Sequence, residues 1–198
     1  GATINVEKEN NFVNGSSVGI YASNGAAVSN AGTVNVGGKD SIGILSMTRR
    51  IDADGNPLPG GSTLSLRNES TGVINMDGES AIGMYFLNNH SYSSNPVNRG
   101  HNYGVINMSG NNAIGILSTG GQVYNMNTIN INSDQGGIGI YATAGTDDTP
   151  HSSDIGSDIG TVINLKSSVS KDNPNIGIFS EISKDGYGSN LSNSGDII

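Results

Sequence analysis

The stretch that decides the fold is VINMSGNNAIGIL at residues 105–117. It joins two short apolar phrases, Val105–Met108 and Ala113–Leu117, through a connection of Ser, Gly and Asn. Alternation of β-branched residues with small or polar ones favours strands, and Gly and Asn favour the bends between strands. The stretch therefore predicts two short strands that are separated by a tight bend.

Both phrases recur six times along the chain. The second phrase has a central glycine, here called the marker glycine, and the six copies are Gly19, Gly43, Gly83, Gly115, Gly139 and Gly177. Successive marker glycines lie 24, 40, 32, 24 and 38 residues apart. The basic unit is therefore 24 residues long, with extra residues in three units, and a period of this length indicates a solenoid.

A third, weaker phrase places an Asn shortly before a Gly, as in Asn30-Ala31-Gly32, Asn102-Tyr103-Gly104 and Asn193-Ser194-Gly195. In Asn125-Met126-Asn127 an Asn takes the place of the Gly, which predicts a position of positive φ. Three phrases per unit fit three strands per turn, whereas eight Leu are too few for leucine-rich repeats. We therefore predict an all-β, right-handed parallel β-helix solenoid with three short strands per rung and about six rungs of basic period 24.

Alternation along each phrase predicts which side chains face the core. The apolar flanks of Ile-Asn-Val should point inward, with the Asn residues outward in a hydrogen-bonded ladder. In Ile-Gly-Ile, both Ile should face inward and the Gly outward. The residue after Ile-Gly-Ile should also face outward, and its six copies would form one column on the surface. This column is either a ladder that shields the sheet or a track that binds a ligand; if the alternation is out of phase, these residues belong to the core instead. The column consists of Tyr21, Leu45, Tyr85, Leu117, Tyr141 and Phe179.

Composition excludes several classes of function. Gly (30), Asn (27) and Ser (27) dominate the 198 residues, and the absence of Cys excludes disulfides, thiolate zinc sites and cysteine nucleophiles. A net charge of −8 argues against nucleic acid or an anionic membrane as a partner. No apolar run is long enough to span a bilayer. The final residues, Gly195–Ile198, resemble the start of a seventh rung, so we expect a segment of a longer array.

The extra residues are candidate recognition elements. They fall near 47–62, 87–100 and 144–158, each after the Ile-Gly-Ile strand, which predicts lateral insertions clustered at one corner of a single unit spanning 1–198. They hold or border all three His and most of the Pro. The candidate ligand-binding residues are Arg49, Arg50, Asp52, Asp54, His90, Tyr92, Arg99, His101, Asp147, Asp148 and His151.

Catalytic and metal-binding motifs are weak. Asp52-Ala53-Asp54-Gly55 resembles the start of an EF-hand loop, but position twelve is Thr63 where a Glu is needed. The three His lack helical pair spacing for zinc, and no nucleophile elbow or phosphate loop is present. We therefore expect no cofactor, no metal and no enzymatic activity.

The phrases Gly-x-Ile-Asn-Met and Ala-Ile-Gly-Ile-Leu resemble the passenger repeats of large autotransporter adhesins of the outer membrane, with those of fusobacteria the most similar. The resemblance covers nearly the whole chain outside the insertions. It implies a signal peptide upstream, a membrane β-barrel downstream as the link to the membrane, and a rod displayed outside the cell. It also implies adhesion to host cells or partner bacteria, and it transfers no ligand motif residue by residue.

These observations together predict a surface-displayed, monomeric adhesin segment whose rod presents corner loops to a surface protein or glycan. Two alternatives stay open. One is a structural stalk whose binding part lies elsewhere, and the other is a polysaccharide-degrading β-helix enzyme.

Overall fold

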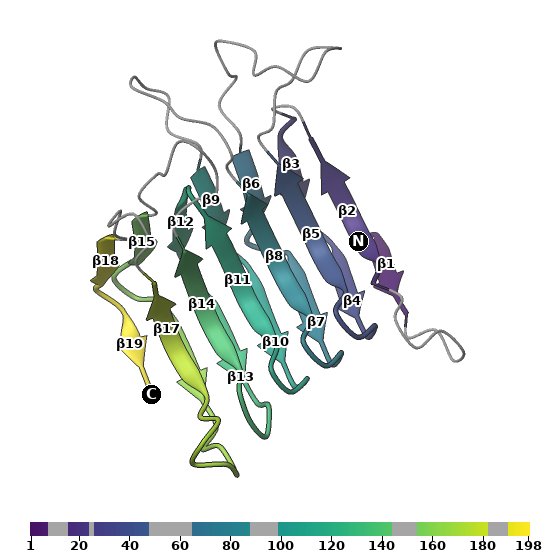
Figure 1. Cartoon of the computed structure of the whole chain (residues 1–198). Coiled ribbons are helices and arrows are strands. Elements are labelled where there is room, and N and C mark those ends of the chain that lie inside the picture. The colour runs from purple at the N-terminus through teal and green to yellow at the C-terminus, as the bar shows by residue number, and fades with distance from the viewer. Residues whose placement is uncertain (8–15, 24–25, 48–64, 88–98, 144–153, 182–189) are drawn as a thin grey trace, which may run out of the picture.

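The fold is known from a computed structural model, which describes residues 1–7, 16–23, 26–47, 65–87, 99–143, 154–181 and 190–198. The described residues form three parallel sheets, and each of the first six rungs contributes one strand to each sheet (Figure 1). The rungs lie side by side from the N-terminal to the C-terminal end of the chain. This arrangement confirms the predicted parallel β-helix solenoid with three strands per rung.

The strands of each sheet correspond to one phrase of the repeat. Sheet A holds the Ile-Asn-Val phrases in β1 (Thr3–Val6), β4 (Thr33–Val36), β7 (Val73–Met76), β10 (Val105–Met108), β13 (Thr128–Ile131), β16 (Val162–Leu165) and β19 (Asp196–Ile197). Sheet B holds the marker phrases in β2 (Val18–Ala22), β5 (Ile42–Met47), β8 (Ile82–Leu87), β11 (Ile114–Thr119), β14 (Ile138–Thr143) and β17 (Ile176–Ser180). Sheet C consists of β3 (Val28–Asn30), β6 (Ser65–Asn68), β9 (Arg99–Asn102), β12 (Gln122–Asn125), β15 (Asp154–Ser157) and β18 (Asn190–Asn193). Because β19 pairs with β16, the last residues do begin a seventh rung.

The register keeps equivalent residues in line. Asn75 pairs with Asn107, and Asn107 with Asn130, although 32 residues separate the first pair and 23 the second. Parallel in-register pairing forces extra residues out of the sheets and into the connections between strands. Rung stacking therefore tolerates units of unequal length.

The core is a column of apolar side chains enclosed by the three sheets. In sheet A the flanks of each phrase face inward, as predicted, and Val34, Val36, Ile74, Ile106 and Met108 have no exposed surface. Sheet B adds Ile44, Met84, Ile116 and Ile140, and sheet C adds Leu66 and Val123, all buried. Removal of this apolar surface from water supplies the main favourable term in folding.

The Asn column of sheet A forms the predicted ladder. Each Nδ2 donates to the Oδ1 of the preceding rung at 2.7–2.9 Å, through Asn35, Asn75, Asn107, Asn130 and Asn164, and the column ends at Asn5. The amides in the middle of the column are half-buried. The ladder therefore couples each rung to the next from outside the core.

A second Asn ladder, which the sequence did not reveal, lies inside the solenoid at the end of sheet C. Asn30 donates to Asn68, Asn68 to Asn102, and Asn102 to Asn125, each at 2.8 Å. Asn68, Asn102 and Asn125 have no exposed surface. Asn30, Asn102 and Asn125 belong to the third phrase, and Asn68 takes the equivalent position in its rung. The direction of donation is opposite to that in sheet A.

The facing predicted for Ile-Gly-Ile is wrong in two positions. The first Ile, as in Ile42 and Ile114, is only half-buried, whereas the marker glycine points toward the core. A Cβ on Gly115 would lie 2.6 Å from the carbonyl oxygen of Gly139 and 3.0 Å from the sulfur of Met108. Because Ile116 also faces inward, the simple alternation fails between Gly115 and Ile116, and the glycine is required by close packing of backbones.

The positive φ predicted for the third phrase is also wrong. Gly32 and Gly104 do not adopt it; instead, a Cβ there would lie 2.2 and 2.1 Å from a backbone oxygen of the preceding rung. Left-handed conformations occur at the corner before sheet B, in Asp40, Ser80, Asn112 and Gly136, at φ 54–66°. These four residues occupy the same position in successive rungs, so one corner geometry repeats along the rod.

The column of residues that follow Ile-Gly-Ile faces outward, as predicted. Tyr21 and Phe179, at the two ends of sheet B, are 58% and 38% exposed. The inner members Leu45, Tyr85, Leu117 and Tyr141 are half-buried, because each has a neighbour on both sides. Neighbouring members of the column therefore cover part of one another's surface.

Candidate functional site on sheet C

The outward face of sheet C carries the polar and aromatic side chains of the candidate site. In β9, Gly100 and Asn102 are buried, so Arg99 and His101 point outward. In β6 the same alternation turns Arg67 outward, and in β12 it turns Tyr124 outward. The register places Arg67 and Tyr124 on either side of His101.

Three rings meet around His101. Its centroid lies 5.4 Å from that of Tyr103, with the planes 10° apart, and 5.7 Å from that of Tyr124, with the planes 25° apart. On the next rung, a Cβ on Gly156 would lie 2.6 Å from Cδ1 of Tyr124, so the tyrosine ring occupies the space above that glycine. We call Arg67, Arg99, His101, Tyr103 and Tyr124 the sheet C patch.

The two arginines of the patch differ from the other described cations. Lys39, Lys166 and Lys171 form ion pairs with Glu79, Asp134 and Asp172. Arg67 and Arg99 are exposed, and no carboxylate of the described residues pairs with either of them. Instead, Nε of Arg67 donates to Ser65 Oγ at 2.9 Å, and Nε of Arg99 donates to Gln122 Oε1 at 3.1 Å. The patch therefore presents two positive charges that no carboxylate of the described residues pairs with, on a chain with a net charge of −8.

The environment of His101 keeps its ring neutral near pH 7. Burial lowers its pKa below the ordinary value of 6.5, and the positive charges of Arg67 and Arg99 lower this pKa further. Its Nδ1 atom is buried and has no hydrogen-bond partner among the described residues. The ring therefore adds a polar aromatic surface to the patch without a third positive charge.

Only two of the residues proposed from sequence lie in this patch, namely Arg99 and His101. The other candidates lie outside the described residues: Arg49, Arg50, Asp52, Asp54, His90, Tyr92, Asp147, Asp148 and His151. Arg67, Tyr103 and Tyr124 were not among the candidates. Arg67, His101 and Tyr124 each come directly before an Asn of the inner ladder (Asn68, Asn102 and Asn125), so an alignment of the units on these Asn residues would have placed them in one row.

The predicted insertions also lie mostly outside the described residues. Their edges overlap strands, because Met47 ends β5, Leu87 ends β8, Arg99 and Gly100 belong to β9, and residues 154–157 form β15. The described strand ends on both sides of each insertion belong to sheets B and C. In the fourth rung, by contrast, only Gly120 and Gly121 separate β11 from β12.

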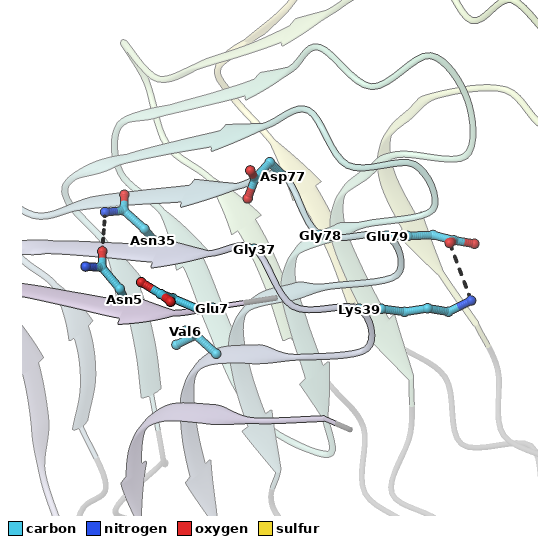
Figure 2. Close-up of a pocket in the computed structure, with 9 residues that line it drawn as sticks. All are labelled: Asn5, Val6, Glu7, Asn35, Gly37, Lys39, Asp77, Gly78 and Glu79. Carbon is cyan, nitrogen blue, oxygen red and sulfur yellow. Dashed lines mark hydrogen bonds and ion pairs between the residues drawn. The ribbon is translucent and has the colours of Figure 1, made fainter. Parts of the chain in front are cut away.

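A concave region lies elsewhere, where the strands of sheet A lead toward sheet B. An open depression of about 630 Å³ is lined by Asn5, Val6, Glu7, Asn35, Gly37, Lys39, Asp77, Gly78 and Glu79. Figure 2 shows the Glu7 and Asp77 carboxylates apart from each other, while Glu79 pairs with Lys39 at 3.4 Å. Among the described residues, no group of three His, Cys, Asp or Glu side chains could hold a metal ion. Because Lys39 of this depression is paired with Glu79, it is less available to an anionic ligand than Arg67 and Arg99 are.

None of the described residues belongs to a helix long and apolar enough to cross a bilayer. No protein-family model, no curated protein and no solved structure matches the chain. Function therefore has to be inferred from the chain's own geometry.

Proposed function

We propose that the chain is a segment of a surface-displayed autotransporter adhesin, in which a monomeric solenoid holds a binding face outside the cell. The observation that carries this proposal is the sheet C patch, where two arginines with no carboxylate partner among the described residues lie beside a cluster of three rings. Uncompensated charge beside aromatic surface is typical of recognition sites rather than of surfaces that only face water. The partner is a protein or a glycan on a host cell or another bacterium.

The scaffold supports this role because it fixes the patch in place. Parallel pairing on both sides of β9, and the buried amides of Asn68, Asn102 and Asn125 beneath the patch, hold Arg67, His101 and Tyr124 in one row. Sites on regular strands are held more closely than sites on connections. The described strand end Arg99, which borders one of the connections between sheets B and C, belongs to the patch, so any contacts that this connection makes would add to those of the patch.

Attachment of the chain to cells tests the proposal. The whole chain is immobilised on beads, and bead attachment to epithelial cells and to partner bacteria is counted. One variant replaces residues 48–64, 88–98 and 144–153 with the Gly-Gly connection of the fourth rung, and a second carries R67Q and R99Q. A matched control shortens residues 8–15, which connect sheet A to sheet B. Circular dichroism and thermal unfolding verify that each variant is folded.

We expect both test variants to lose most of the attachment and the control to keep it. Equal attachment by all variants would favour the structural stalk. Release of new reducing ends from glycans incubated with the chain would support the polysaccharide-degrading enzyme and overturn the proposal.

A further inference from the structure

We propose that the sheet C patch binds a glycan chain through a sugar carboxylate, such as that of a uronic or sialic acid. This inference rests on the proposed binding function and names the chemical class of its ligand. It assigns the carboxylate to Arg67 and Arg99, and the faces of the sugar rings to the aromatic cluster.

The charge of the ligand follows from the arginines. Both guanidinium groups use Nε in a contact with a neutral side chain, from Ser65 in one case and Gln122 in the other. Their terminal nitrogens have no carboxylate partner in the described chain. A guanidinium presents its donors in a planar fork that fits the two oxygens of a carboxylate, which a neutral sugar lacks.

The sugar ring follows from the aromatic cluster. His101, Tyr103 and Tyr124 are half-buried, so each keeps part of its surface for a ligand. Sugars pack their apolar C–H faces on aromatic rings and offer their hydroxyl groups to polar tips such as the tyrosine hydroxyl and a neutral imidazole. The vacancy above Gly156 gives the Tyr124 ring its position, because a side chain there would displace it.

A peptide fits this surface less well than a glycan. The backbone of β9 is hydrogen-bonded to β6 on one side and to β12 on the other, so no edge is open for an added strand. Recognition on this face must use side chains alone. Rungs are spaced about 4.8 Å apart, which is comparable with the length of one sugar residue, so consecutive sugars can lie over consecutive rungs.

The test measures binding of the whole chain to immobilised glycans by biolayer interferometry. The probe is a polyglucuronate oligosaccharide. Its carboxyl-reduced form serves as the neutral comparison, and a sulfated neutral polysaccharide distinguishes a carboxylate requirement from general attraction to anions. The variants are R67Q, R99Q and G156A. K171Q is the charge control, because Lys171 is also an exposed cation (92%) and lies outside the patch.

We expect R67Q and R99Q each to weaken binding about tenfold or more, because each removes a charge-assisted hydrogen bond. G156A should weaken binding roughly two- to tenfold by moving the Tyr124 ring, with the charge unchanged. K171Q should change the affinity less than about twofold. The carboxyl-reduced probe should bind at least tenfold more weakly than the acid.

Three results would overturn the inference: equal binding of the acid and its reduced form, tighter binding of the sulfated probe, or unchanged affinity in folded R67Q and R99Q variants. A separate result tests the proposed function. Beads that attach to cells without inhibition by polyglucuronate would refute the ligand class and leave adhesion standing, whereas beads that never attach would refute adhesion itself.

Discussion

The two Asn ladders allow a direct measurement of how burial changes the value of one hydrogen-bonding pattern. Asn102 accepts from Asn68 and donates to Asn125, both at 2.8 Å, and has no exposed surface. Asn107 accepts from Asn130 at 2.8 Å and donates to Asn75 at 2.9 Å, but it is only half-buried. The change to Ala at either position therefore removes two matched amide–amide bonds from adjacent strands.

The expected costs differ because water can replace only the exposed bonds. In N107A, solvated neighbours limit the loss of unfolding free energy to about 1–2 kcal/mol. In N102A, Oδ1 of Asn125 is left buried without this donor, while Asn68 keeps a longer contact to the oxygen of Gly72 at 3.3 Å. An unsatisfied buried group costs about 1–3 kcal/mol, and a small cavity adds to it, so we expect a total of about 3–5 kcal/mol.

Urea unfolding followed by far-ultraviolet circular dichroism measures both costs. N102S provides an intermediate variant. Ser157 occupies the position equivalent to Asn102 two rungs further along the solenoid, and its hydroxyl is hydrogen-bonded to that of Thr161 at 2.6 Å. The unfolding free energy of N102S should lie between that of the wild type and that of N102A. Equal costs for N102A and N107A would refute the reasoning, because burial would then not control the value of the ladder.

Three further predictions concern single residues. G115A should lower the unfolding free energy by about 1–3 kcal/mol, because its Cβ would meet the carbonyl oxygen of Gly139. G100A should change the unfolding free energy by less than about 1 kcal/mol, because the nearest atom to its Cβ would be a Val123 methyl at 3.3 Å. Urea titrations measure both changes. Because the pKa of His101 is lowered in the folded chain, the unfolded chain binds a proton at this residue first as the pH falls below 6.5. Acidification from pH 7.5 to 5.5 should therefore destabilise the wild type more than H101Q. Identical slopes of unfolding free energy against pH would contradict the lowered pKa. Burial and the hydrogen bond to Glu181 raise the pKa of Tyr141 to about 12. The phenol therefore ionises first in the unfolded chain, and the unfolding free energy should fall as the pH rises from 10 to 12. In an ultraviolet titration, the phenol that ionises near pH 12 should be absent from Y141F and should ionise at a lower pH in E181Q.

Part of the candidate site could be predicted from the sequence. Arg99 and His101 stand out because they border an insertion and because His and Arg are rare in this chain. Arg67 and Tyr124 carry no such signal within their own units and stand out only when the units are aligned with one another. They become neighbours of His101 only through parallel register, which brings together residues 34 and 23 positions apart.

The fold class and the outer Asn ladder could be predicted from the sequence without the structure. Repetition of short β-branched phrases at a basic period of 24 leaves few alternatives, because equivalent phrases can bury their apolar flanks only by stacking. The sequence also predicted that the residue after each Ile-Gly-Ile lies on the outer surface. These properties depend on local alternation, which the chain carries in every unit.

Only the tertiary structure decided the facing of the marker glycines, the burial of the second ladder and the composition of the sheet C patch. The glycines face inward because the next rung's backbone approaches to a distance that excludes a Cβ, and no single unit contains that contact. The inner Asn residues find partners only in neighbouring rungs. The patch likewise requires three successive rungs in register, so its charges and rings converge only once the solenoid has formed.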